Sequence, residues 1–234
     1  MKIGIIGAGH MGSALAGLFS QLGYEVRLAN SRDPGSLRGV AELARAQTAT
    51  CAGAVLGAEL VVLALPIRQV AELPPQLFAS RAPGAPIIDA TNYVVRRDGW
   101  IAPLMDLSCV TESEWVEQQI GAPVVKAFNN MMARHLIELG RPPRHRERLA
   151  LPFFGEAGRG KRLVSNLINS VGFDPVDGGS IEQSWRSQIG TPVFCSNLRA
   201  IGVLRALSQA TVQHTLAYRE AVLVSEGEAS LRQQ

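Results

Sequence analysis

The stretch Lys2-Ile3-Gly4-Ile5-Ile6-Gly7-Ala8-Gly9-His10-Met11-Gly12 decides the fold of this chain. Residues 2–7 form a short apolar run of the kind that becomes a buried strand. Residues 11–22 then place apolar side chains at helical spacing and stop before Gly23, a natural helix end. The order of strand, glycine-rich turn and helix predicts the opening unit of an α/β fold that binds a dinucleotide.

Each glycine of this turn has a separate expected role. Gly7 permits the tight turn, Gly9 lets the backbone approach a pyrophosphate, and Gly12 lets the helix pack closely on the strand. The amide groups of His10 and Met11 would then bind the pyrophosphate at the N-terminus of the helix. A glycine-rich turn without any ligand is the alternative explanation of the same pattern.

The rest of the first part of the chain alternates short apolar runs with helical patterns. The expected strands cover residues 25–29, 59–65, 86–90 and 124–128, and the expected helices cover residues 36–46, 69–78 and 112–119. Strands that alternate with helices indicate a parallel sheet with helices on both faces. We therefore predict the α/β class, with a doubly wound Rossmann sheet.

The pattern changes after about residue 140. We expect a dinucleotide-binding Rossmann domain over residues 1–140 and a small C-terminal α+β appendage over residues 141–234, which contains a long helical stretch at 197–226. The appendage is too short for a full-size substrate domain, but it is long enough to wall one side of a cleft. The apolar stripe of its long helix makes a homodimer possible.

Composition excludes several classes of protein. Hydrophobic residues make up 47% of the chain and charged residues 18%, which excludes a disordered chain. The three cysteines, Cys51, Cys109 and Cys195, form no C-x-x-C pair and favour a reducing compartment. Glycines interrupt the first apolar run and residues 60–66 are too few to span a bilayer, so we expect a soluble, cytoplasmic protein without a membrane partner.

The positive charge is concentrated in one segment. The net charge is +3, and residues 134–162 hold eight Lys or Arg against three Glu. This segment is either a solvated loop or a surface that attracts a polyanion. It has no regularly spaced basic helix and no interleaved aromatic residues, so we expect no nucleic-acid partner.

The end of the second strand predicts which dinucleotide binds. An acidic residue about 20 positions after the glycines would bind the ribose 2′-OH of NAD(H), and none is present at positions 29–32. Ser31 offers a hydroxyl and Arg32 a planar charged fork, which suit a 2′-phosphate, and Arg38 could assist. The sequence therefore predicts a preference for NADP(H).

Loops at the carboxyl ends of other strands would face the ribose and the nicotinamide. The predicted contacts there are Leu65, Pro66, Ala90, Thr91, Asn92, Ala127 and Asn129. An Asn in such a loop is also a common turn residue. His135 could line the site, whereas we expect Lys126 to be an ordinary residue near a strand end, without a role in the site. We expect no catalytic acid–base residue and no metal site.

Five segments together resemble the NADPH-dependent F420 reductases, a family also called F420-dependent NADP oxidoreductases. The segments are residues 7–12, 30–32, 89–93 with 97–99, 124–130 and 173–179, and the resemblance covers nearly the whole chain. Val124-Val125-Lys126-Ala127-Phe128-Asn129-Asn130 is its most specific part.

The resemblance implies direct hydride transfer between the nicotinamide C4 and C5 of a deazaflavin stacked beside it. It also implies that Ser31 and Arg32 contact the 2′-phosphate, and that the loops after Leu65 and Phe128, with residues 178–192, shape the acceptor pocket. A flavin, a quinone or a ferric chelate could replace coenzyme F420. Two alternatives stay open: a non-catalytic NADP(H)-binding redox sensor or partner subunit, and a short relative of the β-hydroxyacid or imine-reducing dehydrogenases.

Overall fold

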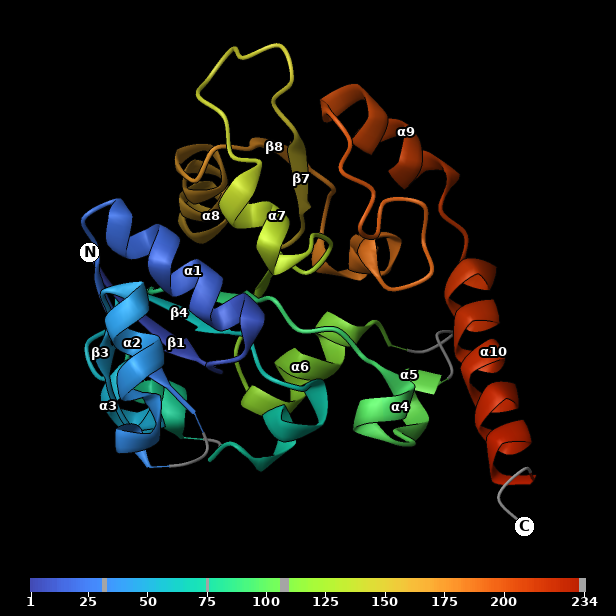
Figure 1. The fold of residues 1–234 in the computed structure, drawn as a ribbon, viewed down its shortest axis with the longest axis horizontal. Coiled ribbons are helices and arrows are strands. Elements are labelled where there is room, and N and C mark those ends of the chain that lie inside the picture. Colours follow the sequence, from blue (N-terminus) through green and yellow to red (C-terminus); the bar gives the residue numbers. More distant parts are fainter. Residues whose placement is uncertain (31–32, 75, 106–109, 232–234) are drawn as a thin grey trace.

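A six-stranded parallel sheet forms the centre of the molecule (Figure 1). The computed structural model describes residues 1–30, 33–74, 76–105 and 110–231. The strands lie in the order β3-β2-β1-β4-β5-β6, which is the doubly wound Rossmann order and confirms the predicted α/β class. Their bounds are β1 (Lys2–Ile6), β2 (Glu25–Ala29), β3 (Gln47–Thr48), β4 (Leu60–Leu63), β5 (Ile87–Asp89) and β6 (Val125–Lys126).

Helices and a second, two-stranded parallel sheet complete the fold. The small sheet consists of β7 (Ala150–Phe153) and β8 (Asp174–Asp177). The helices are α1 (His10–Gln21), α2 (Arg38–Ala44), α3 (Cys51–Val55), α4 (Val95–Asp98), α5 (Ala102–Met105), α6 (Glu112–Ile120), α7 (Ala133–Glu138), α8 (Arg159–Ser170), α9 (Ala200–Gln209) and α10 (Val212–Leu231). The described residues also form 3₁₀ segments at η1 (Pro34–Leu37), η2 (Ile67–Glu72), η3 (Leu77–Ser80) and η4 (Ile181–Ser187).

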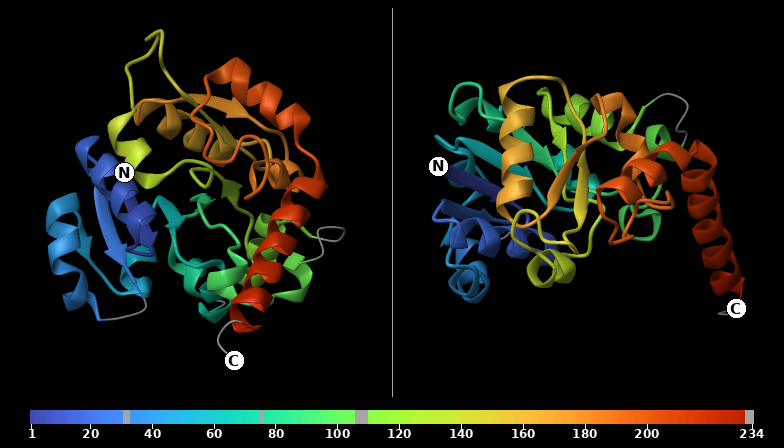
Figure 2. Two further views of the ribbon diagram at one scale, coloured as in Figure 1. Left: turned by 45° about the vertical axis from the view of Figure 1, so that its right-hand side comes forward. Right: turned by 90° about the horizontal axis from the view of Figure 1, so that it is seen from above.

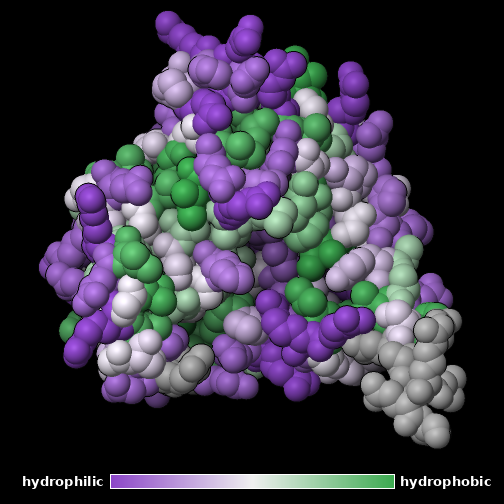
Figure 3. All heavy atoms as spheres, viewed as in Figure 1, coloured by the Kyte–Doolittle hydropathy of each residue, from purple (hydrophilic) through white to green (hydrophobic). Residues whose placement is uncertain are grey.

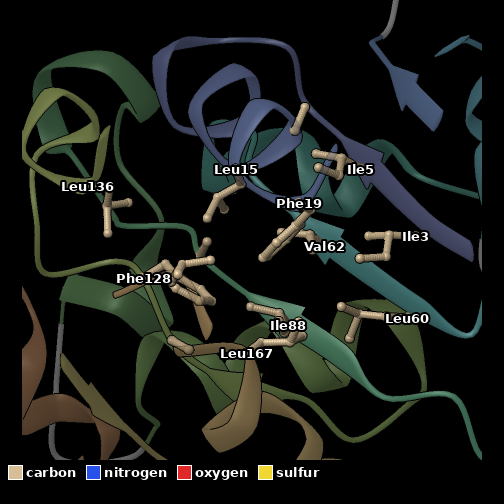
Figure 4. Packing of buried hydrophobic residues seen from close by; sticks show 14 of the residues in the cluster. Ile3, Ile5, Leu15, Phe19, Leu60, Val62, Ile88, Phe128, Leu136 and Leu167 are labelled. Atoms are coloured by element: carbon tan, nitrogen blue, oxygen red, sulfur yellow. The ribbon is translucent and has the colours of Figure 1, made fainter. Parts of the chain in front are cut away.

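The two faces of the main sheet are covered by different helices. Successive strand residues point to opposite faces, so Ile5 packs toward α1 whereas Ile6 packs toward α3 and α6. Figure 4 shows the first face, where Phe19 of α1 and Phe128 lie edge to face with ring centroids 6.2 Å apart. Residues of β7 and α8 belong to this same core, so the small sheet and the main sheet share one hydrophobic interior.

The small sheet also joins the main sheet through the backbone. Lys126 of β6 and Phe154, which follows β7, exchange N–H···O bonds of 2.9 and 3.0 Å in an antiparallel bridge. Phe128 then adopts a positive φ of 64°, which ends β6 early and turns the chain toward α7.

Glycines let other backbone segments approach β1. A Cβ at Gly4 would lie 2.1 Å from the Ala54 carbonyl oxygen of α3, and a Cβ at Gly7 would lie 2.2 Å from the Ala64 oxygen after β4. Gly12 of α1 is equally constrained, because its Cβ would lie 1.8 Å from the Gly7 oxygen. Helix α1 can therefore sit directly over the turn.

The long helix predicted for residues 197–226 is wrong. Asn197 has a positive φ of 49°, and Ala210 is extended with φ −64° and ψ 137°, so the stretch divides into α9 and α10. Figure 2 shows the two helices at an angle, with α10 along the edge of the molecule beside α4. Within the described residues, no helix is both long enough and apolar enough to cross a membrane.

The helix predicted for residues 69–78 is also wrong. Pro74 cannot supply the amide that a continuing helix needs, and the described residues of this segment form only η2 and η3. The helix predicted for 36–46 begins as η1 and ends at Arg45, whose φ is 53°. The short elements β3, α3, α4, α5 and α7 have too few residues to show a periodicity.

We predict that Gly4→Ala lowers the free energy of unfolding by about 2 kcal/mol or more, because the new methyl group overlaps the backbone of α3. Gly39→Ala is the matched control, since nothing lies within 4 Å of its added Cβ, and it should be neutral or stabilise by up to about 1 kcal/mol. Urea unfolding measures both. Equal stability of the two variants would contradict the close packing of β1 on α3.

Candidate functional site

A cleft of about 950 Å³ opens at the carboxyl ends of the parallel strands. Loops that follow β1, β2, β4, β5 and β6 line it, and residues 189–195 of the C-terminal part form one wall. Figure 3 shows the corresponding face, with hydrophobic and hydrophilic residues around a central hollow. This is the position at which open α/β sheets bind ligands, because the strand order reverses between β1 and β4.

The glycine-rich turn forms one part of the cleft lining. Gly7, Gly9, His10 and Met11 all line it, as the sequence predicts for a pyrophosphate site. Gly9 is the N-cap residue of α1, and no side chain caps the helix there. An added Cβ at Gly9 would meet no protein atom within 4 Å. Gly12 does not line the cleft; it lies beneath the turn and allows α1 to pack against it.

The end of β2 forms the outer part of the cleft. Asn30, Ser36 and Cys51 line it there, and the Cys51 thiol donates to the Asn30 carbonyl oxygen at 3.4 Å. Burial raises the pKa of the Cys51 thiol. The predicted 2′-phosphate contacts, Ser31 and Arg32, lie outside the described residues. Arg38 is exposed at the start of α2 and does not line the cleft.

The inner part of the cleft contains six of the seven residues predicted at the other strand ends. Leu65, Pro66, Ala90, Thr91, Asn92 and Asn129 line the cleft. Ala127 does not: its side chain is completely buried in the core next to Phe128. Because residues alternate along β6, Ala127 packs on the α1 face of the sheet.

Apolar side chains that the sequence analysis did not name complete the inner cleft. Met131 and Met132 follow β6, and Ile189, Phe194 and Cys195 approach from the C-terminal part. Met132 is 50% exposed although it is apolar. No periodic pattern marks residues 189–195, because they form an irregular segment whose shape depends on positive φ at Gly190 and Cys195.

A chain of amide groups crosses the floor of the inner cleft. The Asn92 amide donates to the Asn129 carbonyl oxygen at 2.8 Å, and the Asn129 amide donates to the Ser187 carbonyl oxygen at 2.9 Å. These bonds join the loops after β5 and β6 to η4. They give the inner cleft neutral hydrogen-bonding groups beside apolar surface, a combination that suits a polar heterocyclic ring.

Lys126 is not an ordinary residue near a strand end. It lies directly opposite Asp89 in the β5–β6 register, and both side chains are completely buried. The Lys126 ammonium donates to Asp89 Oδ2 at 3.0 Å and to the Thr91 carbonyl oxygen at 2.7 Å. Ser113 of α6 also donates to Asp89 at 2.7 Å. The prediction failed because strand register brings these residues together from 37 positions apart.

A second buried ion pair lies beside the first. Arg219 of α10 donates to Glu112 Oε1 at 2.9 Å, and its guanidinium lies over the Tyr93 ring at 5.0 Å from the centroid. The other Glu112 oxygen accepts from the Tyr93 amide at 3.1 Å. Burial raises the pKa of Glu112, and this effect exceeds the opposing attraction of Lys126 and Arg219.

His135 and the basic segment lie away from the cleft. His135 does not line it; its Nδ1 lies 3.1 Å from the Asn197 side-chain oxygen. No residue from 134 to 162 lines the cleft. Arg148 is buried rather than solvated, and it donates to the carbonyl oxygens of Asn169 and Phe173 at 2.8 Å. Among the described residues, no group of three or more His, Cys, Asp or Glu could hold a metal ion.

The first part of this chain matches the profile of a known family. The family profile described as "NADP oxidoreductase coenzyme F420-dependent" matches residues 2–93, from β1 to the loop after β5. The Escherichia coli (strain K12) protein YjhV is 42% identical over 65 residues, which are 28% of this chain and 47% of that protein. The chain thus spans about half the length of this curated relative.

Two solved structures are similar over most of the chain. The hypothetical protein SMa0349 from Sinorhizobium meliloti is 32% identical with a TM-score of 0.72, and the match covers 85% of this chain and 95% of that chain. A proposed F420-dependent NADP-reductase from Arthrobacter sp. FB24 is 25% identical with a TM-score of 0.64. That match covers 79% of this chain and 87% of the other.

We predict that Glu112 makes stability depend on pH. Its pKa is raised in the folded protein, so its contribution is present below its unperturbed value of 4.5 and is lost as the pH rises through the raised pKa. The free energy of unfolding of the wild type relative to Glu112→Gln should therefore fall as the pH rises from 4.5. Urea unfolding at stepped pH values measures this difference, and a difference independent of pH would contradict it.

Proposed function

Because the chain belongs to the family of coenzyme F420-dependent NADP oxidoreductases, we propose that it transfers a hydride between NADP(H) and a flat redox acceptor, such as coenzyme F420 or a flavin. The observation that carries this proposal is the form of the cleft. One part has an open glycine turn at a helix N-terminus, and the other has neutral amides facing apolar side chains.

The open position at Gly9 supports a bound pyrophosphate. Gly9 has an ordinary φ of −73°, so the fold itself does not require glycine there. The absent Cβ leaves space at the point where the amides of His10 and Met11 begin α1. A phosphate group in this space would accept hydrogen bonds from backbone N–H groups and benefit from the helix dipole.

The inner cleft supports two stacked rings. Thr91, Asn92 and Asn129 would orient the nicotinamide through hydrogen bonds, and Met132, Ile189 and Phe194 would cover an acceptor ring and exclude water. Bound NADPH would supply the hydride. The protein would contribute mainly the alignment of the two rings in a dry cleft, which needs no acid–base dyad.

We predict that Gly9→Ala separates binding from folding. The added methyl group touches no protein atom, so the free energy of unfolding should fall by no more than about 1 kcal/mol. The methyl group occupies the pyrophosphate space, so the Kd for NADPH should rise about tenfold or more. Titration of NADPH fluorescence measures the Kd, with Gly39→Ala as the control. An unchanged Kd in Gly9→Ala would contradict the pyrophosphate site.

The proposed reaction is tested by mixing the purified protein and NADPH with coenzyme F420, FMN, FAD, quinones and ferric chelates in turn. We expect loss of NADPH absorbance together with reduction of coenzyme F420, a flavin or a quinone, each of which can accept a hydride. This reaction should be faster with NADPH than with NADH. Arg32→Ala should narrow the preference for NADPH over NADH.

The same experiment, with a keto acid and an imine added to the acceptors, distinguishes the alternatives. Tight NADPH binding without turnover of any acceptor would support a redox sensor. Reduction of a keto acid or an imine instead would support a short relative of the β-hydroxyacid or imine-reducing dehydrogenases. Either outcome would overturn the proposed acceptor class.

A further inference from the structure

The loop after β5, residues 90–94, is held by charged side chains rather than by a helix or strand. The Thr91 amide donates to Asp89 at 2.9 Å, and the Val94 amide donates to Asp98 at 2.9 Å. The Tyr93 amide donates to Glu112. The carbonyl oxygens of Thr91 and Asn92 accept from Lys126 and Arg97, each at 2.7 Å.

Lys126 differs from Arg97, the other cation that donates to the backbone of this loop. Its ammonium and the carboxylate of Asp89 are both fully buried, whereas the Arg97 side chain is 44% exposed. A buried ion pair adds little net stability, because desolvation offsets the Coulomb attraction. The pair instead fixes the positions of its neighbours. The Lys126 ammonium on β6 binds both Asp89 of β5 and the Thr91 carbonyl oxygen.

We propose that Lys126 is a positioning residue for the nicotinamide half of NADP(H). This inference rests on the proposed function. Lys126 does not line the cleft, but it fixes the Thr91 carbonyl oxygen from below, while Thr91 and Asn92 line the cleft above. Asp89 fixes the other side of the same residue, because it accepts from both the amide and the hydroxyl of Thr91.

The placement of the loop explains why only one half of the dinucleotide should be affected. Residues 90–94 follow β5, which lies on the β4 side of the point where the strand order reverses. The glycine turn follows β1, and the predicted 2′-phosphate contacts follow β2 on the other side. A change at Lys126 should therefore disturb nicotinamide contacts and leave the pyrophosphate and adenosine contacts intact.

The experiment uses the double variant Asp89→Asn/Lys126→Met, which removes both buried charges together and leaves no unpaired ion. Two ligands are titrated: NADPH, and 2′-phospho-ADP-ribose, which lacks the nicotinamide. We expect the Kd for NADPH to rise about tenfold or more, and the Kd for 2′-phospho-ADP-ribose to stay unchanged. Asp89→Asn/Lys126→Gln restores a neutral donor toward Thr91 and should recover part of the NADPH affinity.

Arg148→Met is the matched control, because Arg148 is also a buried cation that binds backbone carbonyls but lies away from the cleft. It should lower stability and leave both Kd values unchanged. Equal weakening of both ligands in the Lys126 variants, or no weakening of NADPH, would overturn the positioning role. If the wild type binds neither NADPH nor 2′-phospho-ADP-ribose, the proposed function itself is overturned.

Discussion

The absence of a side chain at Gly4 of β1, at Gly7 of the turn after it and at Gly12 of α1 is the constraint on which the rest of the structure depends. Carbonyl oxygens of α3 and of the residue after β4 occupy the space where Cβ atoms of Gly4 and Gly7 would lie. Gly12 brings α1 over the same turn. Three backbone segments therefore meet around one strand, and this meeting point lies where the strand order reverses. The cleft opens there because the loops of β1 and β4 diverge from a shared, tightly packed base.

Buried charges hold the loop that lines the inner cleft, whereas glycines allow the close backbone packing beneath the glycine-rich turn. Asp89, Lys126, Glu112 and Arg219 occupy the interior between the sheet, α6 and α10. Charges in such a position are costly unless each is paired and hydrogen-bonded, as these are. Asp89, Lys126 and Glu112 bind backbone groups of the irregular loop at residues 90–94, which no helix or sheet pairs. Arg219 also ties the C-terminal helix to this loop, so segments far apart in the sequence support one surface of the cleft.

The strands and glycines were predictable because their signals are local. Continuous apolar runs such as residues 60–63 mark strands buried on both faces, and the turn at 7–12 has a spacing that few other structures use. The division of 197–226 was not predictable from periodicity, because an apolar stripe continues across a break as easily as through a helix. After the break at Ala210, α10 packs at His214 and Tyr218 against Gly190, a contact that no local pattern contains.

By itself, the sequence determined the α/β class, the glycine turn and which loops would meet at the carboxyl edge of the sheet, since period and turn chemistry act over a few residues. Tertiary structure alone decided which residues of those loops face the cleft. It placed Ala127 in the core and Asn129 in the cleft, and it paired Lys126 with Asp89. The physical reason is strand register. Shifting one strand by a single residue would move each of its side chains to the other face of the sheet, and register is set by packing across the whole sheet.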